Sequence, residues 1–91
     1  MVSSYRIVIL KSALKDKEKI KEIPALKNNV DKLIEVLKTD PFKNPPPYEK
    51  LSGNYKELYS RRINRQHRLV YKVKKEDRVV TIISMWSHYE F

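Results

Sequence analysis

The chain has 91 residues, with 20 Lys and Arg against 11 Asp and Glu, and it contains no cysteine. This length allows a single domain with one modest core, which we expect to span residues 1–91. The absence of cysteine excludes disulfides, a zinc ribbon and a thiolate nucleophile, and 2 His are too few for an imidazole-based metal site. No signal-peptide pattern and no membrane-spanning apolar stretch is present, so we expect a soluble, cytoplasmic protein without membrane association.

The formal net charge of +9 favours polyanionic partners, such as nucleic acid, an anionic membrane or an acidic protein. This charge is unevenly distributed, because residues 56–75 contain eight basic residues and a single acidic one, Glu57. Net charge by itself is also compatible with a soluble basic domain whose side chains are only solvated.

The first half of the chain predicts one strand and two helices. Residues 5–10 are short and rich in β-branched and aromatic side chains, which is typical of a strand. Ser12 can cap a helix that runs to about Glu22, and Pro24 ends that helix and fits the first turn of the next. The apolar positions of this second helix recur with a helical period and predict the main core helix: Leu26, Val30, Leu33, Ile34 and Leu37.

The second half predicts a connection followed by three strands. The prolines at 45–47 forbid both a helix and a central strand, so residues 39 to about 56 are expected to form a connection. The strands are expected at 58–63, 68–73 and 78–89, with a turn at 74–77. The whole order is an α+β fold of one strand, two helices and a three-stranded antiparallel run, with both helices on one face of the sheet.

Strand alternation predicts which side chains share the open face of that sheet. Opposing residues in an antiparallel pair have a constant index sum, so a hairpin loop of three or five residues puts Arg68 and His88 on one face. A loop of two or four residues, or a bulge, would reverse this assignment. The odd loop places the more apolar set against the helices: Leu69, Tyr71, Val73, Val79, Ile83 and Met85. The other set is left on the open face: Arg68, Val70, Lys72, Ile82, Ser84, Trp86 and His88.

An open basic sheet face with planar side chains suits RNA. Because RNA supplies its own 2′-hydroxyl nucleophile, metal-free cleavage needs only a base, a cation over the phosphate and an acid for the departing 5′-oxygen. Glu49, Arg68 and His88 are chemically suited to these roles. Each also has a simpler explanation: Glu49 as a solvated loop carboxylate, Arg68 as a surface ion-pair partner of Glu76 or Asp77, and His88 as a structural residue.

The neighbouring basic side chains can likewise either act on RNA or have a simpler role, solvated or structural. Arg61, Arg62 and Arg65 can simply be solvated, and His67 is best explained by a hydrogen bond to backbone. Residue types and spacing cannot show that any of these side chains meet at one phosphate.

Three segments, PPPYEKLSG at 45–53, YSRRINRQHRLVYKV at 59–73 and SMWSHYE at 84–90, closely resemble the YoeB/Txe family of the RelE-like superfamily. The helices agree more loosely, in element order and in the TDPF-type exit at 39–42. The family consists of ribosome-dependent mRNA endonuclease toxins of type II toxin–antitoxin systems. The resemblance therefore implies a RelE-like domain that cleaves mRNA in the ribosomal A site, without metal or cofactor, to a 2′,3′-cyclic phosphate and a 5′-hydroxyl.

The resemblance also implies roles for individual residues. The general base falls on Glu49, the transition-state arginine on Arg68 and the general acid on His88. Tyr89 matches a tyrosine that helps to orient the RNA, and Arg62 matches a basic residue near the phosphate. Three further basic residues complete the expected RNA-binding set: Arg61, Arg65 and Lys50.

The implied partners are the ribosome, mRNA and a cognate antitoxin of the YefM/Axe type, whose acidic C-terminal segment wraps the toxin. Some family members dimerise, so a homodimer is also open. The alternatives are a ParE-type toxin that targets DNA gyrase and lacks the catalytic set, and a non-catalytic RNA- or ribosome-binding module. A test for mRNA cleavage on ribosomes distinguishes the endonuclease from both alternatives, because neither of them is expected to cut mRNA.

Two positions depart from the family pattern. Many relatives have a glycine just before the strand that begins near residue 59, where this chain has Glu57 and Leu58. Some members carry a lysine three positions after the catalytic glutamate, where this chain has Ser52, and Lys50 could substitute for it. A negative side chain at 57 could alter RNA contact or the entry into the strand.

Overall fold

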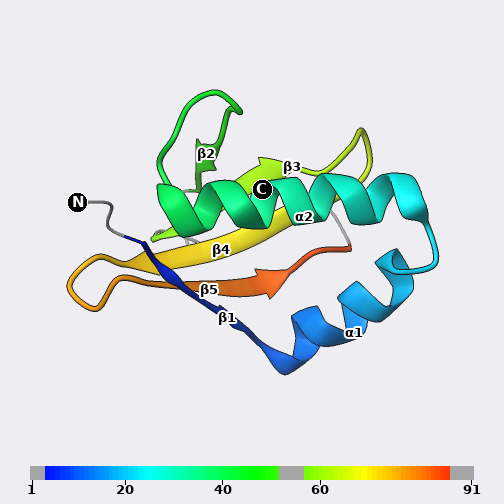
Figure 1. Ribbon diagram of the computed structural model, residues 1–91, viewed down its shortest axis with the longest axis horizontal. Helices are drawn as coiled ribbons and strands as arrows, with labels where there is room; N and C mark the ends of the chain where they lie inside the picture. The colour runs from blue at the N-terminus through cyan, green and yellow to red at the C-terminus, as the bar shows by residue number, and fades with distance from the viewer. Residues whose placement is uncertain (1–3, 52–56, 87–91) are drawn as a thin grey trace.

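The computed structural model describes residues 4–51 and 57–86, and the predicted α+β order of one strand, two helices and three final strands is confirmed (Figure 1). A two-residue strand that the sequence did not predict precedes the last three. Neither helix in these ranges is long and apolar enough to cross a membrane. The elements are β1 (Arg6–Ile9), α1 (Lys11–Ile20), α2 (Pro24–Thr39), β2 (Glu49–Lys50), β3 (Leu58–Arg62), β4 (Arg68–Lys74) and β5 (Val79–Ser84).

The strands form one sheet in the order β1-β5-β4-β3-β2. β1 runs parallel to β5, and the remaining neighbours are antiparallel. The connection from β1 through both helices therefore carries the chain to the opposite edge of the sheet, where β2 lies, and the first and last strands are neighbours. Figure 1 shows α2 lying across the sheet and α1 beyond the end of β1.

The helices bury their predicted apolar faces against one side of this sheet. Pro24 is at the first turn of α2, as expected from its fixed φ and missing N–H. Ile20 of α1 is buried, whereas Leu14 and Ile23 are 47% and 39% exposed, so the apolar stripe of α1 is only partly used. The core residues of α2 and of the strands are Leu26, Val30, Leu33, Leu37, Leu69, Tyr71, Val80 and Ile82, and Met85 joins them just after β5.

The hairpin between β4 and β5 corrects part of the face assignment. Lys74 is opposite Val79, so the loop has four residues, which is one of the lengths that reverse the predicted faces. Val80 and Ile82 consequently face the helices and are fully buried. The prediction that Val79 and Ile83 face the helices, with Ile82 on the open face, is therefore wrong.

A bulge near the end of β5 then restores the predicted pairing between β4 and β5. Tyr71 is opposite Ile82 but the next residue, Val70, is opposite Ser84, so one residue of β5 is left without a partner. Beyond this point Met85 faces the core as predicted. Trp86 also packs against the core, so its predicted place on the open face is wrong. Along β4, the side chains predicted to face the helices do so: Leu69, Tyr71 and Val73.

Candidate active site

The register of β2, β3 and β4 brings three predicted site residues to the open face of the sheet. Glu49 of β2 is opposite Ser60 of β3, and Arg62 of β3 is opposite Arg68 of β4. Paired residues share a face, as do residues two apart along a strand, so these four side chains lie on one side. Ser60 was not predicted as part of the site. The sequence could have indicated it, because Ser60 lies two residues from Arg62 in a predicted strand and therefore shares its face.

Arg68 is the centre of this group. Its Nη1 lies 3.5 Å from Oε1 of Glu49 and donates a hydrogen bond to the Ser60 hydroxyl at 3.2 Å. The Arg68 side chain is 22% exposed and that of Glu49 is 63% exposed, so the guanidinium is held by the sheet while the carboxylate stays accessible. The partner of Arg68 is therefore Glu49, rather than the simpler alternatives, Glu76 or Asp77.

These side chains surround a hollow of about 240 Å³, which we call the Glu49–Arg68 hollow. An accessible carboxylate can accept a proton, and a guanidinium can donate hydrogen bonds to phosphate oxygens. The arrangement is suited to holding a phosphodiester while the proton of a neighbouring hydroxyl is removed. The hollow is lined by Pro47, Tyr48, Glu49, Ser60, Arg62 and Arg68.

Arg61 does not face this hollow, because successive strand residues alternate and it points into the protein. It is 1% exposed. Its guanidinium donates to the carbonyl oxygens of Pro46, Pro41 and Lys43 at 2.6, 3.0 and 2.9 Å, and its Nε donates to the Tyr71 hydroxyl at 3.2 Å. The predicted RNA contact of Arg61 is therefore contradicted, since its donors are bonded within the protein.

Tyr71 is the buried partner of that arginine. Burial raises the pKa of its phenol above the ordinary value of 10.0, although the nearby Arg61 guanidinium acts in the opposite direction. The phenol is therefore neutral at physiological pH, and its hydroxyl both accepts a hydrogen bond from Arg61 and donates one to the Pro41 carbonyl at 2.9 Å.

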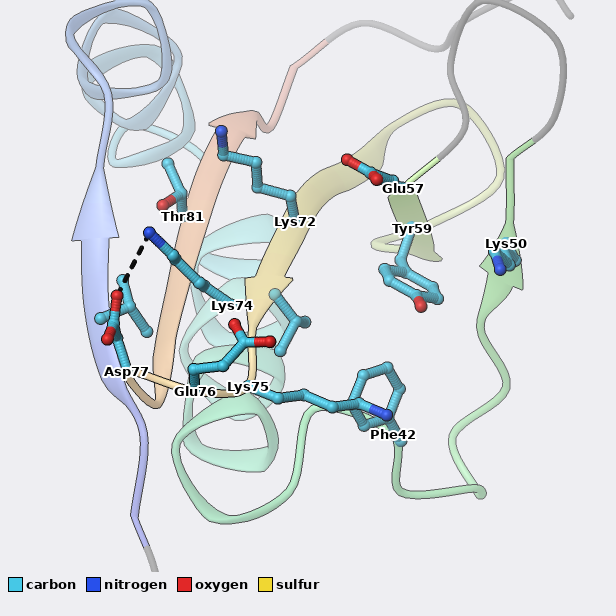
Figure 2. Close-up of a pocket in the computed structure, with 12 residues that line it drawn as sticks. Phe42, Lys50, Glu57, Tyr59, Lys72, Lys74, Lys75, Glu76, Asp77 and Thr81 are labelled. Atoms are coloured by element: carbon cyan, nitrogen blue, oxygen red, sulfur yellow. Dashed lines mark ion pairs between the residues drawn. The ribbon is translucent and has the colours of Figure 1, made fainter.

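Lys50 lies on the other side of β2 from Glu49, opposite Tyr59. It lines a second and larger hollow of about 670 Å³. Figure 2 shows Lys72 and Thr81 on one side of that hollow, and Lys50 and Tyr59 on the other. Its charged lining is mixed: Lys50, Lys72, Lys74, Lys75, Glu57, Glu76 and Asp77. The larger hollow thus lacks the carboxylate–arginine pair of the smaller one.

The remaining predicted residues are outside the hollow or outside the described ranges. Arg65 is exposed in the loop between β3 and β4 and does not line the Glu49–Arg68 hollow. His67 stacks on Trp86 with ring centroids 4.4 Å apart, and its Nδ1 bonds to the Trp86 carbonyl, which confirms the predicted backbone partner. His88 and Tyr89 lie outside the described residues. Within those residues, no cluster of three His, Asp or Glu side chains could hold a metal ion.

Comparisons with known proteins agree with this fold. The profile of a family described as YoeB-like toxin of bacterial type II toxin–antitoxin system matches residues 11–89. Toxin YoeB of Synechocystis sp. is 40% identical over 65 residues, which are 71% of this chain and 73% of the relative.

Solved structures are similar over nearly the whole chain. The YoeB/ParE toxin from Agrobacterium tumefaciens has a TM-score of 0.85 at 28% identity, over 92% of this chain and 99% of the other. A chain of the YoeB–YefM complex from Staphylococcus aureus has a TM-score of 0.79 at 29% identity, over 93% and 98%. Because the family profile spans most of the sequence and the fold agrees, this chain belongs to the YoeB-like toxins of bacterial type II toxin–antitoxin systems.

Proposed function

We propose that this toxin is an endoribonuclease that cleaves mRNA in the ribosomal A site and thereby inhibits translation in the cytoplasm. The observation that carries the proposal is the accessible Glu49 carboxylate, 3.5 Å from the Arg68 guanidinium on the open face of a basic sheet. Attack by a ribose hydroxyl on the adjacent phosphate needs a base for the hydroxyl proton and a cation for the phosphate, and the two side chains lie next to each other here.

In the proposed reaction, Glu49 removes the proton of a 2′-hydroxyl and the O2′ attacks the neighbouring phosphorus. Arg68, held by Ser60, stabilises the charge that develops on the phosphoryl oxygens. The bond between phosphorus and the 5′-oxygen breaks, and His88 gives that oxygen a proton. The products are a 2′,3′-cyclic phosphate and a 5′-hydroxyl.

The other basic residues of the proposed interface contact the RNA around this phosphate. Arg62 lines the Glu49–Arg68 hollow and adds a second guanidinium. Arg65 and Lys50 lie outside the hollow and would reach flanking phosphates, and Tyr89 is proposed to orient the RNA.

A cognate antitoxin is the proposed regulator. The Staphylococcus aureus relative is solved in a complex with YefM, which supports a partner of that type. An acidic segment of the antitoxin would be attracted by the net charge of +9 and would compete with RNA for the basic face. A homodimer of the free toxin stays a prediction.

A static RNA clamp explains the site less well than an enzyme does. A carboxylate beside a bound phosphate repels it, so a clamp gains nothing from Glu49, whereas a nuclease needs that carboxylate as a base. A ParE-type toxin is expected to lack the catalytic set, whereas this chain has Glu49 and Arg68 next to each other.

The test is cleavage of a defined mRNA on purified ribosomes, with the new 5′ ends mapped. Wild-type protein is expected to cut within the A-site codon, and Glu49→Gln is expected to slow cleavage roughly 10²- to 10⁴-fold, as is typical for loss of a general base. Glu76→Gln is the matched control, because it removes an exposed carboxylate from the distant hairpin and should leave the rate unchanged. Uncut mRNA with the wild type, or wild-type rates with Glu49→Gln, would refute the proposal.

A further inference from the structure

The loop that delivers Glu49 to the site has little regular structure of its own. It runs from Pro41 to Tyr48 between α2 and β2, and its three consecutive prolines have no backbone N–H to donate. Its carbonyl groups therefore need donors from elsewhere in the protein, since buried carbonyls without a partner are costly.

Arg61 supplies those donors at both ends of the loop. Its guanidinium bonds to the Pro41 and Lys43 carbonyls where the loop begins and to the Pro46 carbonyl near its end. The guanidinium carbon also lies 5.0 Å from the ring centroid of Tyr48, the residue directly before Glu49. One buried side chain thus connects the start of the loop to the residue adjoining the proposed base.

β3, the strand that contains Arg61, also contributes Ser60 to the lining of the Glu49–Arg68 hollow. Ser60, which precedes Arg61, is paired with Glu49 and accepts the hydrogen bond of Arg68. The loop is therefore bonded through Arg61 to β3, and on the open face of the sheet β3 contacts both Glu49 and Arg68 through Ser60. A shift of the loop relative to this strand would change the distance between the carboxylate and the guanidinium.

We propose that Arg61, together with the Tyr71 hydroxyl, is a positioning residue that fixes the proline-rich loop and so sets the distance from Glu49 to Arg68. This inference rests on the proposed nuclease function. Catalysis is sensitive to such placement, because a displacement of about 1 Å in a reacting group can cost roughly 10²-fold in rate. Since Arg61 has no surface available to RNA, its loss should affect cleavage and leave ribosome binding intact.

Tyr71→Phe is the sharpest variant. It removes only the hydroxyl that links Arg61 to the Pro41 carbonyl and keeps the buried ring. Arg61→Lys is the stronger companion, because an ammonium keeps the charge but lacks the planar fork that reaches several carbonyls at once. The matched control is Asn29→Ala, which removes a side-chain hydrogen bond of 3.0 Å from α2 to the Ile63 carbonyl, directly after β3, and leaves the proline-rich loop untouched.

Three quantities are measured for each variant below its melting temperature: the single-turnover cleavage rate on ribosomes, the Kd for ribosomes, and amide hydrogen exchange over residues 41–50. We expect Tyr71→Phe to cleave at least 10-fold more slowly and Arg61→Lys roughly 10²-fold more slowly. Both should bind ribosomes within about 2-fold of wild type and exchange faster over 41–50. Asn29→Ala should lose stability and keep its cleavage rate.

Several results would overturn the positioning role. They are wild-type cleavage by Tyr71→Phe, an equal loss of cleavage in Asn29→Ala, or ribosome binding that weakens in step with cleavage. If Glu49→Gln is inactive while Tyr71→Phe is fully active, only the positioning role fails. If Glu49→Gln itself cleaves normally, the proposed function fails.

Discussion

Glu57 has a φ of 76°, in the left-handed region that favours glycine, at the residue before β3 begins. The family resemblance predicted a glycine in this region, where the chain has Glu57 and Leu58. A non-glycine residue there has its Cβ close to the following carbonyl oxygen, which costs about 1–2 kcal/mol. The left-handed conformation of Glu57 is therefore strained at the entry into the strand that carries Ser60 and Arg62.

Glu57→Gly is expected to raise the free energy of unfolding. Relief of the left-handed strain is offset in part by the greater chain entropy of glycine, which leaves a net gain of about 0.5–1 kcal/mol. Urea unfolding measures this change. Glu57→Ala is the control, because it removes the same charge but keeps the Cβ, and it should give no comparable gain. Equal stabilisation by alanine would assign the effect to charge and contradict the backbone explanation.

Arg61 and Arg62 show how much of a site depends on strand phase. The sequence presents two consecutive arginines in a predicted strand, and both were expected to contact RNA. In the structure one is 1% exposed and bonded to a loop, while the other lines the Glu49–Arg68 hollow. The phase of β3 is set by its pairing with β4 and β2, and residue type alone carries no information about it.

At the level of elements, two side chains of α1 form hydrogen bonds to the backbone at the end of β5. The Ser12 hydroxyl donates to the Ile83 carbonyl at 3.0 Å, and the Met85 N–H donates to the Asp16 carboxylate at 3.0 Å. Ser12 was expected to cap α1, but the helix begins at Lys11 without a side-chain cap. The bulge at Ile83 interrupts the ladder there, and side chains of α1 bond to backbone groups of the bulge residue and of Met85 just after β5.

Asp16→Ala is expected to destabilise the protein by about 1–3 kcal/mol, because it leaves the buried Met85 N–H without its acceptor. Asp16→Asn keeps a carbonyl oxygen in the same place and should cost less. Chemical unfolding measures the loss, and hydrogen exchange at the Met85 amide localises it. Glu18→Ala, on the exposed side of α1, should change stability by no more than about 0.5 kcal/mol. An equal loss in both alanine variants would contradict this role of Asp16.

The sequence predicted which segments form the helices and final strands better than it predicted how the strands pair. Helical periodicity is strong in α2, where Val30, Leu33 and Leu37 are buried as predicted. The β4–β5 register was partly wrong because Ile82 and Ile83 are both apolar, so composition could not distinguish a four-residue loop with a bulge from an odd loop. β2 was missed because two residues after three prolines form no detectable pattern.

For the molecule as a whole, the net charge of +9 and the topology act together. β1 pairs with β5 at one edge of the sheet, and β2 brings Glu49 to the opposite edge, next to β3 and β4. The helices cover the other face, so the Glu49–Arg68 hollow lies open in a positive field. Such a field attracts both RNA and an acidic antitoxin segment, with affinities that fall as salt increases.

The most direct test of the proposed chemistry uses a ribosome-bound mRNA with one 2′-deoxy nucleotide immediately 5′ to the mapped cleavage position. If Glu49 activates the 2′-hydroxyl, this single substitution should abolish cleavage at that bond, while ribosome binding by the toxin stays unchanged. The all-ribose mRNA should be cut there to a 2′,3′-cyclic phosphate and a 5′-hydroxyl. Cleavage of the deoxy-substituted bond at the ribose rate would contradict attack by the substrate's own hydroxyl, and with it the role proposed for Glu49.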